Sequence, residues 1–254
     1  MFSQTKFKIG RIFGGPLNVD ISLLLIAGMF VVSSSRGASS LLGALVAGLL
    51  GAAALAVALL VHEVGHAAVA MSFGCRVHEI TLMFFGGYAA ISNLPSAPLR
   101  RAGISFAGPG AGLVLWWLAP RLALFSPFPV LVVFLYEVAR FSLYLSVFNL
   151  IPAVPLDGGH ILRDVIAHFK GIPFARMVSY RVSKIVAIAM GLYGILHGRL
   201  MLILIAFFIW ASAKNDLARG GASGDDPDNL DDDVVVISPP PYGKDKEYTR
   251  IRRP

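Results

Sequence analysis

The stretch ALLVHEVGHAAVA, residues 58–70, decides how this chain is organised. It places His62, Glu63 and His66 inside a run of otherwise apolar residues. Ionisable side chains are costly in hydrocarbon, so their presence in an apolar span usually marks a functional site. On a helix, residues four apart share a face, and the two histidines can therefore bind one metal ion. Glu63 lies about 100° further round the helix, where it can reach a water molecule beside that ion.

This spacing is the H-E-x-x-H arrangement, in which two histidines bind zinc and the glutamate acts as a general base. The alternative is a pair of core histidines that contact backbone carbonyls. In a membrane that alternative is less attractive, because Glu63 would also need a partner. We therefore expect one Zn²⁺ ion at His62 and His66, with Glu63 as the catalytic base.

The composition of the whole chain is typical of a membrane protein. Hydrophobic residues make up 56% of the 254 residues and charged residues only 15%, whereas soluble domains average about 25% charged residues. A membrane-spanning helix needs about 20 mostly apolar residues. Six stretches are candidates: residues 17–34, 41–66, 102–119, 128–149, 177–196 and 199–213. The sequence predicts an all-α polytopic membrane protein with about six transmembrane helices.

The basic residues are distributed unevenly between the loops. The net charge is +7, and most Lys and Arg residues fall in the loops on one side of the predicted spans, which should be cytoplasmic. We expect a multi-pass protein of the cell membrane with both termini in the cytoplasm and an uncleaved first span. No basic patch is interleaved with aromatic residues, so nucleic acid is not an expected partner.

One segment between the second and third spans departs from the helical pattern. Residues 76–92, RVHEITLMFFGGYAAIS, contain β-forming residues around Gly86 and Gly87, which predicts a small membrane-associated β-hairpin. An open sheet edge cannot face lipid, so the hairpin should pack against protein or line a wet cavity. A plain interfacial loop is the alternative.

The end of the chain differs in composition from the rest. Residues 212–254 are rich in Gly, Pro and charge, and such a composition is typical of disorder. We therefore expect an integral-membrane domain at residues 1–211, with core spans at about residues 41–170, followed by a disordered polar tail.

A catalytic zinc ion usually has three protein ligands and an open fourth position. Residues 148–164, FNLIPAVPLDGGHILRD, offer Asp157 and His160 as further candidates. Pro152 and Pro155 should interrupt the helix there, and the two glycines after Asp157 would let the backbone approach the second span closely. The alternative is a surface turn in which Asp157 caps the next helix, and this segment alone favours that alternative.

Four motifs together resemble those of the site-2 protease family of intramembrane zinc metalloproteases. They are HEVGH (62–66), FFGGYA (84–89), FAGPGAG (106–112) and NLIPAVPLDGG (149–159), and the resemblance covers roughly residues 10–210. The chain resembles the compact type of this family, which has neither PDZ nor CBS domains, because no insertion is long enough for a PDZ domain and the tail is too short for CBS domains. One departure is Gly112, where many members have Asn, which puts a polar contact of the third span in doubt.

The resemblance implies a role for each matching residue. His62, His66 and Asp157 would bind Zn²⁺, and Glu63 would activate water. Asn149 would help to hold substrate, and the segment around Gly86 and Gly87 would present a strand edge to an unwound substrate. His160 then becomes a residue that lines the cavity.

The resulting expectation is an intramembrane zinc metalloendopeptidase that acts in regulated intramembrane proteolysis. It would cleave a peptide bond in or near the transmembrane segment of a single-span protein within the lipid bilayer. The alternative is a non-proteolytic zinc-binding membrane scaffold or transporter. Transport favours polar residues through the full membrane depth, whereas here they cluster at one end. The sequence names neither the physiological substrate nor any regulatory membrane partner.

Overall fold

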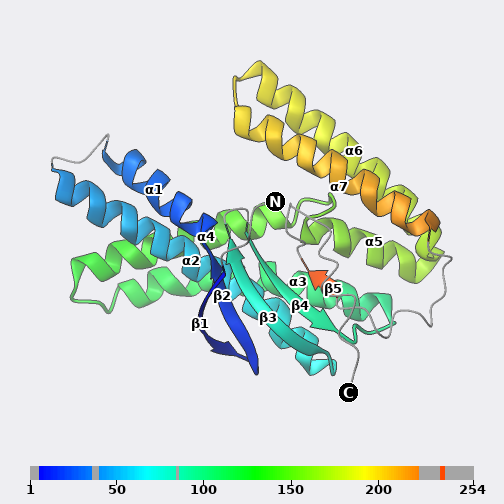
Figure 1. The fold of residues 1–254 in the computed structure, drawn as a ribbon, viewed down its shortest axis with the longest axis horizontal. Coiled ribbons are helices and arrows are strands. Elements are labelled where there is room, and N and C mark those ends of the chain that lie inside the picture. The colour runs from blue at the N-terminus through cyan, green and yellow to red at the C-terminus, as the bar shows by residue number, and fades with distance from the viewer. Residues whose placement is uncertain (1–5, 36–39, 84–85, 223–234, 238–254) are drawn as a thin grey trace. The chain divides into compact units, whose positions relative to one another are not determined.

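The computed structural model describes residues 6–35, 40–83, 86–222 and 235–237. The described elements are β1 (Lys6–Ile12), β2 (Gly15–Asp20), α1 (Ser22–Ser35), α2 (Leu41–Ser72), β3 (Arg76–Met83), β4 (Gly86–Ser92), α3 (Pro98–Ala123), α4 (Pro129–Asn149), α5 (Asp157–Lys170), α6 (Ile172–Leu196), α7 (Leu200–Ala222) and β5 (Val235–Ile237) (Figure 1). The chain divides into two compact units. The first consists of Met1–Ala68, Val77–Ala90 and Ala107–Val147, and the second consists of Val69–Arg76, Ile91–Phe106 and Phe148–Pro254.

Five of the described helices are long and apolar enough to cross a membrane. They are α2, α3, α4, α6 and the Leu200–Ala218 part of α7. This confirms the prediction of a polytopic, mainly helical membrane protein. The helix α5, of 14 residues, is too short to be counted among the spans.

The first predicted span, residues 17–34, is the exception. Residues 17–20 belong to strand β2, and α1 has only 14 residues, which is shorter than the about 20 that a span needs. Asp20 Oδ1 accepts a hydrogen bond from the Ser22 amide at 2.8 Å. Such a bond satisfies a free donor in the first turn of a helix, so α1 begins there and not several residues earlier.

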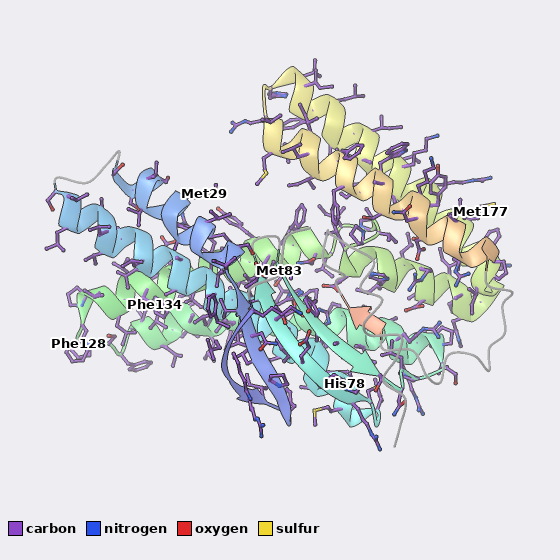
Figure 2. All side chains as sticks on the ribbon, viewed as in Figure 1. Met29, His78, Met83, Phe128, Phe134 and Met177 are labelled. Atoms are coloured by element: carbon purple, nitrogen blue, oxygen red, sulfur yellow. The ribbon has the colours of Figure 1, made fainter. Side chains whose placement is uncertain are left out.

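Strands β1 to β4 lie side by side in chain order in one sheet (Figure 1). Strands β1 and β2 form an antiparallel hairpin, and its two-residue turn has positive φ angles at Phe13 (54°) and Gly14 (83°), as tight hairpin turns require. Strand β2 also pairs in parallel with β3, with Leu17 opposite Ile80. His78 and Met83 lie on β3, toward its two ends (Figure 2). The expected β-structure in residues 76–92 is therefore present, within a larger sheet than predicted.

Small residues let the helices of the first unit pack closely. Ala54, Ala119, Val138 and Ala139 form a buried cluster contributed by α2, α3 and α4. A Cβ atom on Gly65 of α2 would lie only 2.6 Å from the Ala107 carbonyl oxygen of α3. Such close backbone approach is common between membrane helices. The hydrophobic effect does not drive helices together in lipid, and small residues at the interface allow close van der Waals packing instead.

The second unit contains α5, α6 and α7. Its core includes Ala153, Ala187 and Ile209, and Arg101 Nη2 lies 3.2 Å from the carboxylate of Asp164 on α5. Helix α7 continues to Ala222, past the predicted start of the tail at residue 212. A three-residue strand, β5, is also assigned within that predicted tail. The remainder, residues 223–234 and 238–254, lies outside the described residues.

Candidate metal centre

One turn of α2 carries His62 and His66, which are buried with exposed fractions of 2% and 0%. Their Nε2 atoms lie 3.2 Å apart. Two imidazole ligands at 2.0–2.1 Å from a tetrahedral zinc ion have nitrogens about 3.3 Å apart. The two histidines are therefore already spaced as ligands of one ion.

Helix α3 leaves room for the second imidazole through a glycine. A Cβ atom on Gly108 would lie 2.2 Å from Nε2 of His66, closer than any real contact. The absence of a side chain at Gly108 is therefore a condition for the observed position of His66. Gly108 lies in the FAGPGAG motif (106–112), but no local pattern in that motif connects it with this histidine.

We predict that Gly108→Ala weakens zinc binding by about 10- to 100-fold, the range seen when groups that orient metal ligands are changed. The new methyl group forces His66 away from its position. Gly103→Ala, on the same helix, is the matched control, because a Cβ atom there has nothing within 4 Å. Zinc affinity of the two purified variants, measured by competition with a chelating dye, decides the matter. Equal affinity in both would contradict the role given to Gly108.

The carboxylate of Glu63 is buried beside strand β4, with 1% of the residue exposed. A Cβ atom on Gly87 would lie 2.6 Å from Glu63 Cγ and 2.8 Å from its Oε1 atom. The bare backbone of β4 therefore packs directly on this side chain. The preceding Gly86 has a φ of 133°, a conformation that L-residues with side chains rarely adopt. Of the predicted glycine pair, Gly87 thus lies at the general-base candidate, and a Cβ atom on Gly86 would have nothing within 4 Å.

Gly112, the position of the departure noted in the sequence, lies against α4. A Cβ atom at this position of α3 would lie 2.2 Å from the hydroxyl oxygen of Ser146 on α4. Ser146 is fully buried. A side chain at position 112 would require the Ser146 hydroxyl group to move, because that group occupies the space a Cβ atom would take.

The segment before Asp157 is not helical, as the two prolines predict. Helix α4 ends at Asn149 and α5 begins at Asp157. The loop is held by Ser183 of α6, whose hydroxyl oxygen accepts a hydrogen bond from the Val154 amide at 2.9 Å. Asp157 itself is 0% exposed and lies in the first turn of α5, where the helix dipole favours a negative charge.

One alternative for this segment needs correction. The residue at the N-cap of α5 is Leu156, and no side chain caps the helix, so the alternative of a capping Asp157 does not hold. The nearest neighbours of a Cβ atom on Gly158 or Gly159 are backbone atoms of the preceding loop, at 2.3 and 2.4 Å. The glycines allow the loop to fold back on the start of α5.

The donor atoms of His62, His66 and Asp157 form a possible metal site. One ligand atom from each residue lies within 4.8 Å of the others. Two imidazoles and one carboxylate are a ligand set of catalytic zinc sites, which keep a fourth position for water or substrate. The residues present therefore fit a zinc ion by number, type and burial.

Among the described residues, His160 is not part of this group. Asn149 is the last residue of α4 and is half-buried. His160 lies in the first turn of α5, where burial and, to a smaller extent, the charge of Arg163 lower its pKa to about 4. The imidazole of His160 is therefore neutral at pH 7.

Comparisons with known proteins relate the chain to peptidase family M50. Residues 50–129 and 128–193 match peptidase family M50. The protein sll0528 of Synechocystis sp. is 33% identical over 84% of this chain and 60% of its own length. Zinc metalloprotease MJ0392 of Methanocaldococcus jannaschii is 30% identical over 83% of this chain and 60% of its own. The chain thus spans about 60% of the length of these curated relatives.

A solved structure is also similar. The site-2 protease from Methanocaldococcus jannaschii superposes with a TM-score of 0.58 and is 27% identical. The alignment covers 84% of this chain and 95% of the solved chain. The likeness therefore extends over nearly all of the solved chain.

Proposed function

The chain belongs to peptidase family M50, and from that premise we propose that it is a zinc-dependent intramembrane protease. It hydrolyses a peptide bond in or near the transmembrane segment of a membrane-anchored protein. The observation that carries this proposal is the spacing of His62 and His66, with Nε2 atoms 3.2 Å apart on a helix long and apolar enough to span a membrane. Glu63, on the same turn, supplies the base.

His62, His66 and Asp157 hold the Zn²⁺ ion in this proposal. When bound, zinc supplies Lewis-acid activation of water, so that a nucleophile is available at neutral pH. The carboxylate of Asp157 offsets part of the ion's charge in a site of low dielectric constant. His160 and Asn149 line the cavity, and Asn149 helps to hold the substrate backbone.

Glu63 moves the proton. Its carboxylate accepts a proton from the attacking water and returns it to the amide nitrogen of the leaving strand. The packing of Gly87 against Glu63 fixes where this carboxylate lies. Because Glu63 is almost fully buried, its carboxylate is not in contact with bulk water.

The substrate in this proposal is a single-span membrane protein. A helical span must unwind before its carbonyl groups can react, since intact helix hydrogen bonds occupy them. Gly86 of β4, next to the glycine that packs on the base, has open space where a side chain would be, because a Cβ atom there would have nothing within 4 Å. An unwound segment can approach closely there.

Zinc-dependent cleavage by the purified protein tests the proposal. Reconstituted protein is incubated with single-span substrates, first as prepared, then after chelation, and then with zinc restored. We expect cleavage to stop on chelation and to return with zinc. Cleavage that is unaffected by complete removal of zinc would contradict the proposal, and binding of zinc without any cleavage would favour the scaffold or transporter.

We also propose that the C-terminus and the loop before α3 face the cytoplasm, as the Lys and Arg distribution predicts. In a Cys75→Ser background, Ser96→Cys and a cysteine at the C-terminus should be labelled only from the cytoplasmic side of sealed vesicles. Phe125→Cys, on an 85% exposed residue of the opposite loop, is the matched control and should be labelled only from the other side. The reverse pattern would invert the orientation.

A further inference from the structure

A polar network joins all four strands of the N-terminal part of the sheet. The Tyr88 hydroxyl on β4 lies 2.6 Å from the Lys6 ammonium on β1 and 2.6 Å from Glu79 Oε1 on β3. Lys6 also contacts Glu79 directly at 3.2 Å. Asn18 on β2 donates to the other carboxylate oxygen of Glu79 at 3.1 Å. Each strand therefore contributes one side chain.

The network is largely removed from solvent. Tyr88 is only 2% exposed, and the side chains of Lys6 and Glu79 are 22% and 14% exposed. A charge that is this buried depends on its partner, because removing one member leaves the other uncompensated. Loss of Lys6 therefore disturbs Glu79 and, through it, Tyr88.

Tyr88 directly follows the glycine that packs on the general-base candidate. Successive residues of a strand point to opposite faces of the sheet. Gly87 presents its bare Cα to the Glu63 side chain, with a notional Cβ atom 2.6 Å from Glu63 Cγ. The Tyr88 hydroxyl anchors β4 through its bonds to Lys6 and Glu79. A shift of β4 would therefore change the space available to the carboxylate of Glu63.

We propose that Lys6, Glu79 and Tyr88 are positioning residues for the reaction. They fix strand β4, and the backbone of Gly87 in turn fixes Glu63. This inference rests on the proposed function, because it assigns a role within that reaction. It makes the N-terminal hairpin part of the catalytic unit, although none of the three side chains is required to touch substrate.

The test separates positioning from folding and from metal binding. Tyr88→Phe keeps the ring and removes only the hydroxyl group. We expect its kcat to fall by about 10- to 100-fold, since small displacements of reacting groups have effects of that size. KM and zinc content should be unchanged, and thermal unfolding should show that the variant is folded at the assay temperature.

Rescue provides the second readout. Lys6→Met should lower kcat, because the carboxylate of Glu79 loses its cation. The double variant Lys6→Met/Glu79→Gln removes the charge and keeps an acceptor for Tyr88, so its kcat should recover to within a few-fold of wild type. Lys8→Met is the matched control, since Lys8 lies exposed on the same strand, and it should have wild-type kcat.

Two results overturn the inference. One is a wild-type kcat in folded Tyr88→Phe, and the other is a double variant that is no better than Lys6→Met alone. Both leave the proposed function intact, because wild type still cleaves. A wild-type protein that holds zinc and cleaves no substrate would instead overturn the proposed function, and the inference with it.

Discussion

Glu63→Gln is expected to abolish cleavage while the protein keeps its zinc. Glutamine has the same shape, so the packing against Gly87 is retained, but an amide cannot accept the proton of water. Loss of a general base typically lowers the rate by about 10²- to 10⁴-fold. Zinc content should stay at the wild-type value, because His62, His66 and Asp157 are untouched. Cleavage of a single-span substrate and zinc per protein are measured on the same preparation.

A matched control is available on α4. Glu137 forms an ion pair with Arg140 at the surface of the helix, and Glu137→Gln makes the same chemical change outside the metal centre. We expect this variant to cleave at the wild-type rate. Full activity in Glu63→Gln would show that Glu63 is not the base.

Asp157→Ala is expected to lose both tightly bound zinc and activity. The ligand atoms of His62, His66 and Asp157 lie within 4.8 Å of one another, and a third ligand is needed to complete a catalytic zinc site. His160→Ala should keep its zinc, with activity reduced by about 10- to 100-fold at most, as for residues that support metal ligands without binding the metal. Zinc per protein in the two purified variants is the measurement.

His160 serves as the control for this assignment, because it lies on the same first turn of α5 as Asp157. Both substitutions truncate a side chain to methyl at the same helix end, so a general effect on folding should appear in both. The assignment of the third ligand would be wrong if His160→Ala lost zinc and Asp157→Ala kept it.

The features that depend on local spacing could be predicted from the sequence. Positions i and i+4 of one helix place His62 and His66 together wherever the helix lies, and the observed 3.2 Å between their Nε2 atoms follows from that spacing. The prolines at 152 and 155 act on their own backbone, so the break between α4 and α5 could also be predicted. The length of the apolar stretches correctly predicted five of the six proposed spans.

The features that depend on distant partners could not be predicted. The first predicted span began at residue 17, but Leu17 belongs to a strand that pairs with β3, where its partner is Ile80. The role of Gly108 depends on the position of an imidazole on another helix. The polar network of Lys6, Glu79 and Tyr88 brings together residues up to 82 positions apart, and no periodicity in the sequence indicates it.

Mapping the cut in a substrate tests the central claim most directly. The purified protein and a single-span substrate are placed together in liposomes, and the products are identified by mass spectrometry. An intramembrane protease should give new termini in or next to the apolar segment of the substrate, in wild type and not in Glu63→Gln. Products cut only in the soluble flanks, or the same products from Glu63→Gln, would contradict the account.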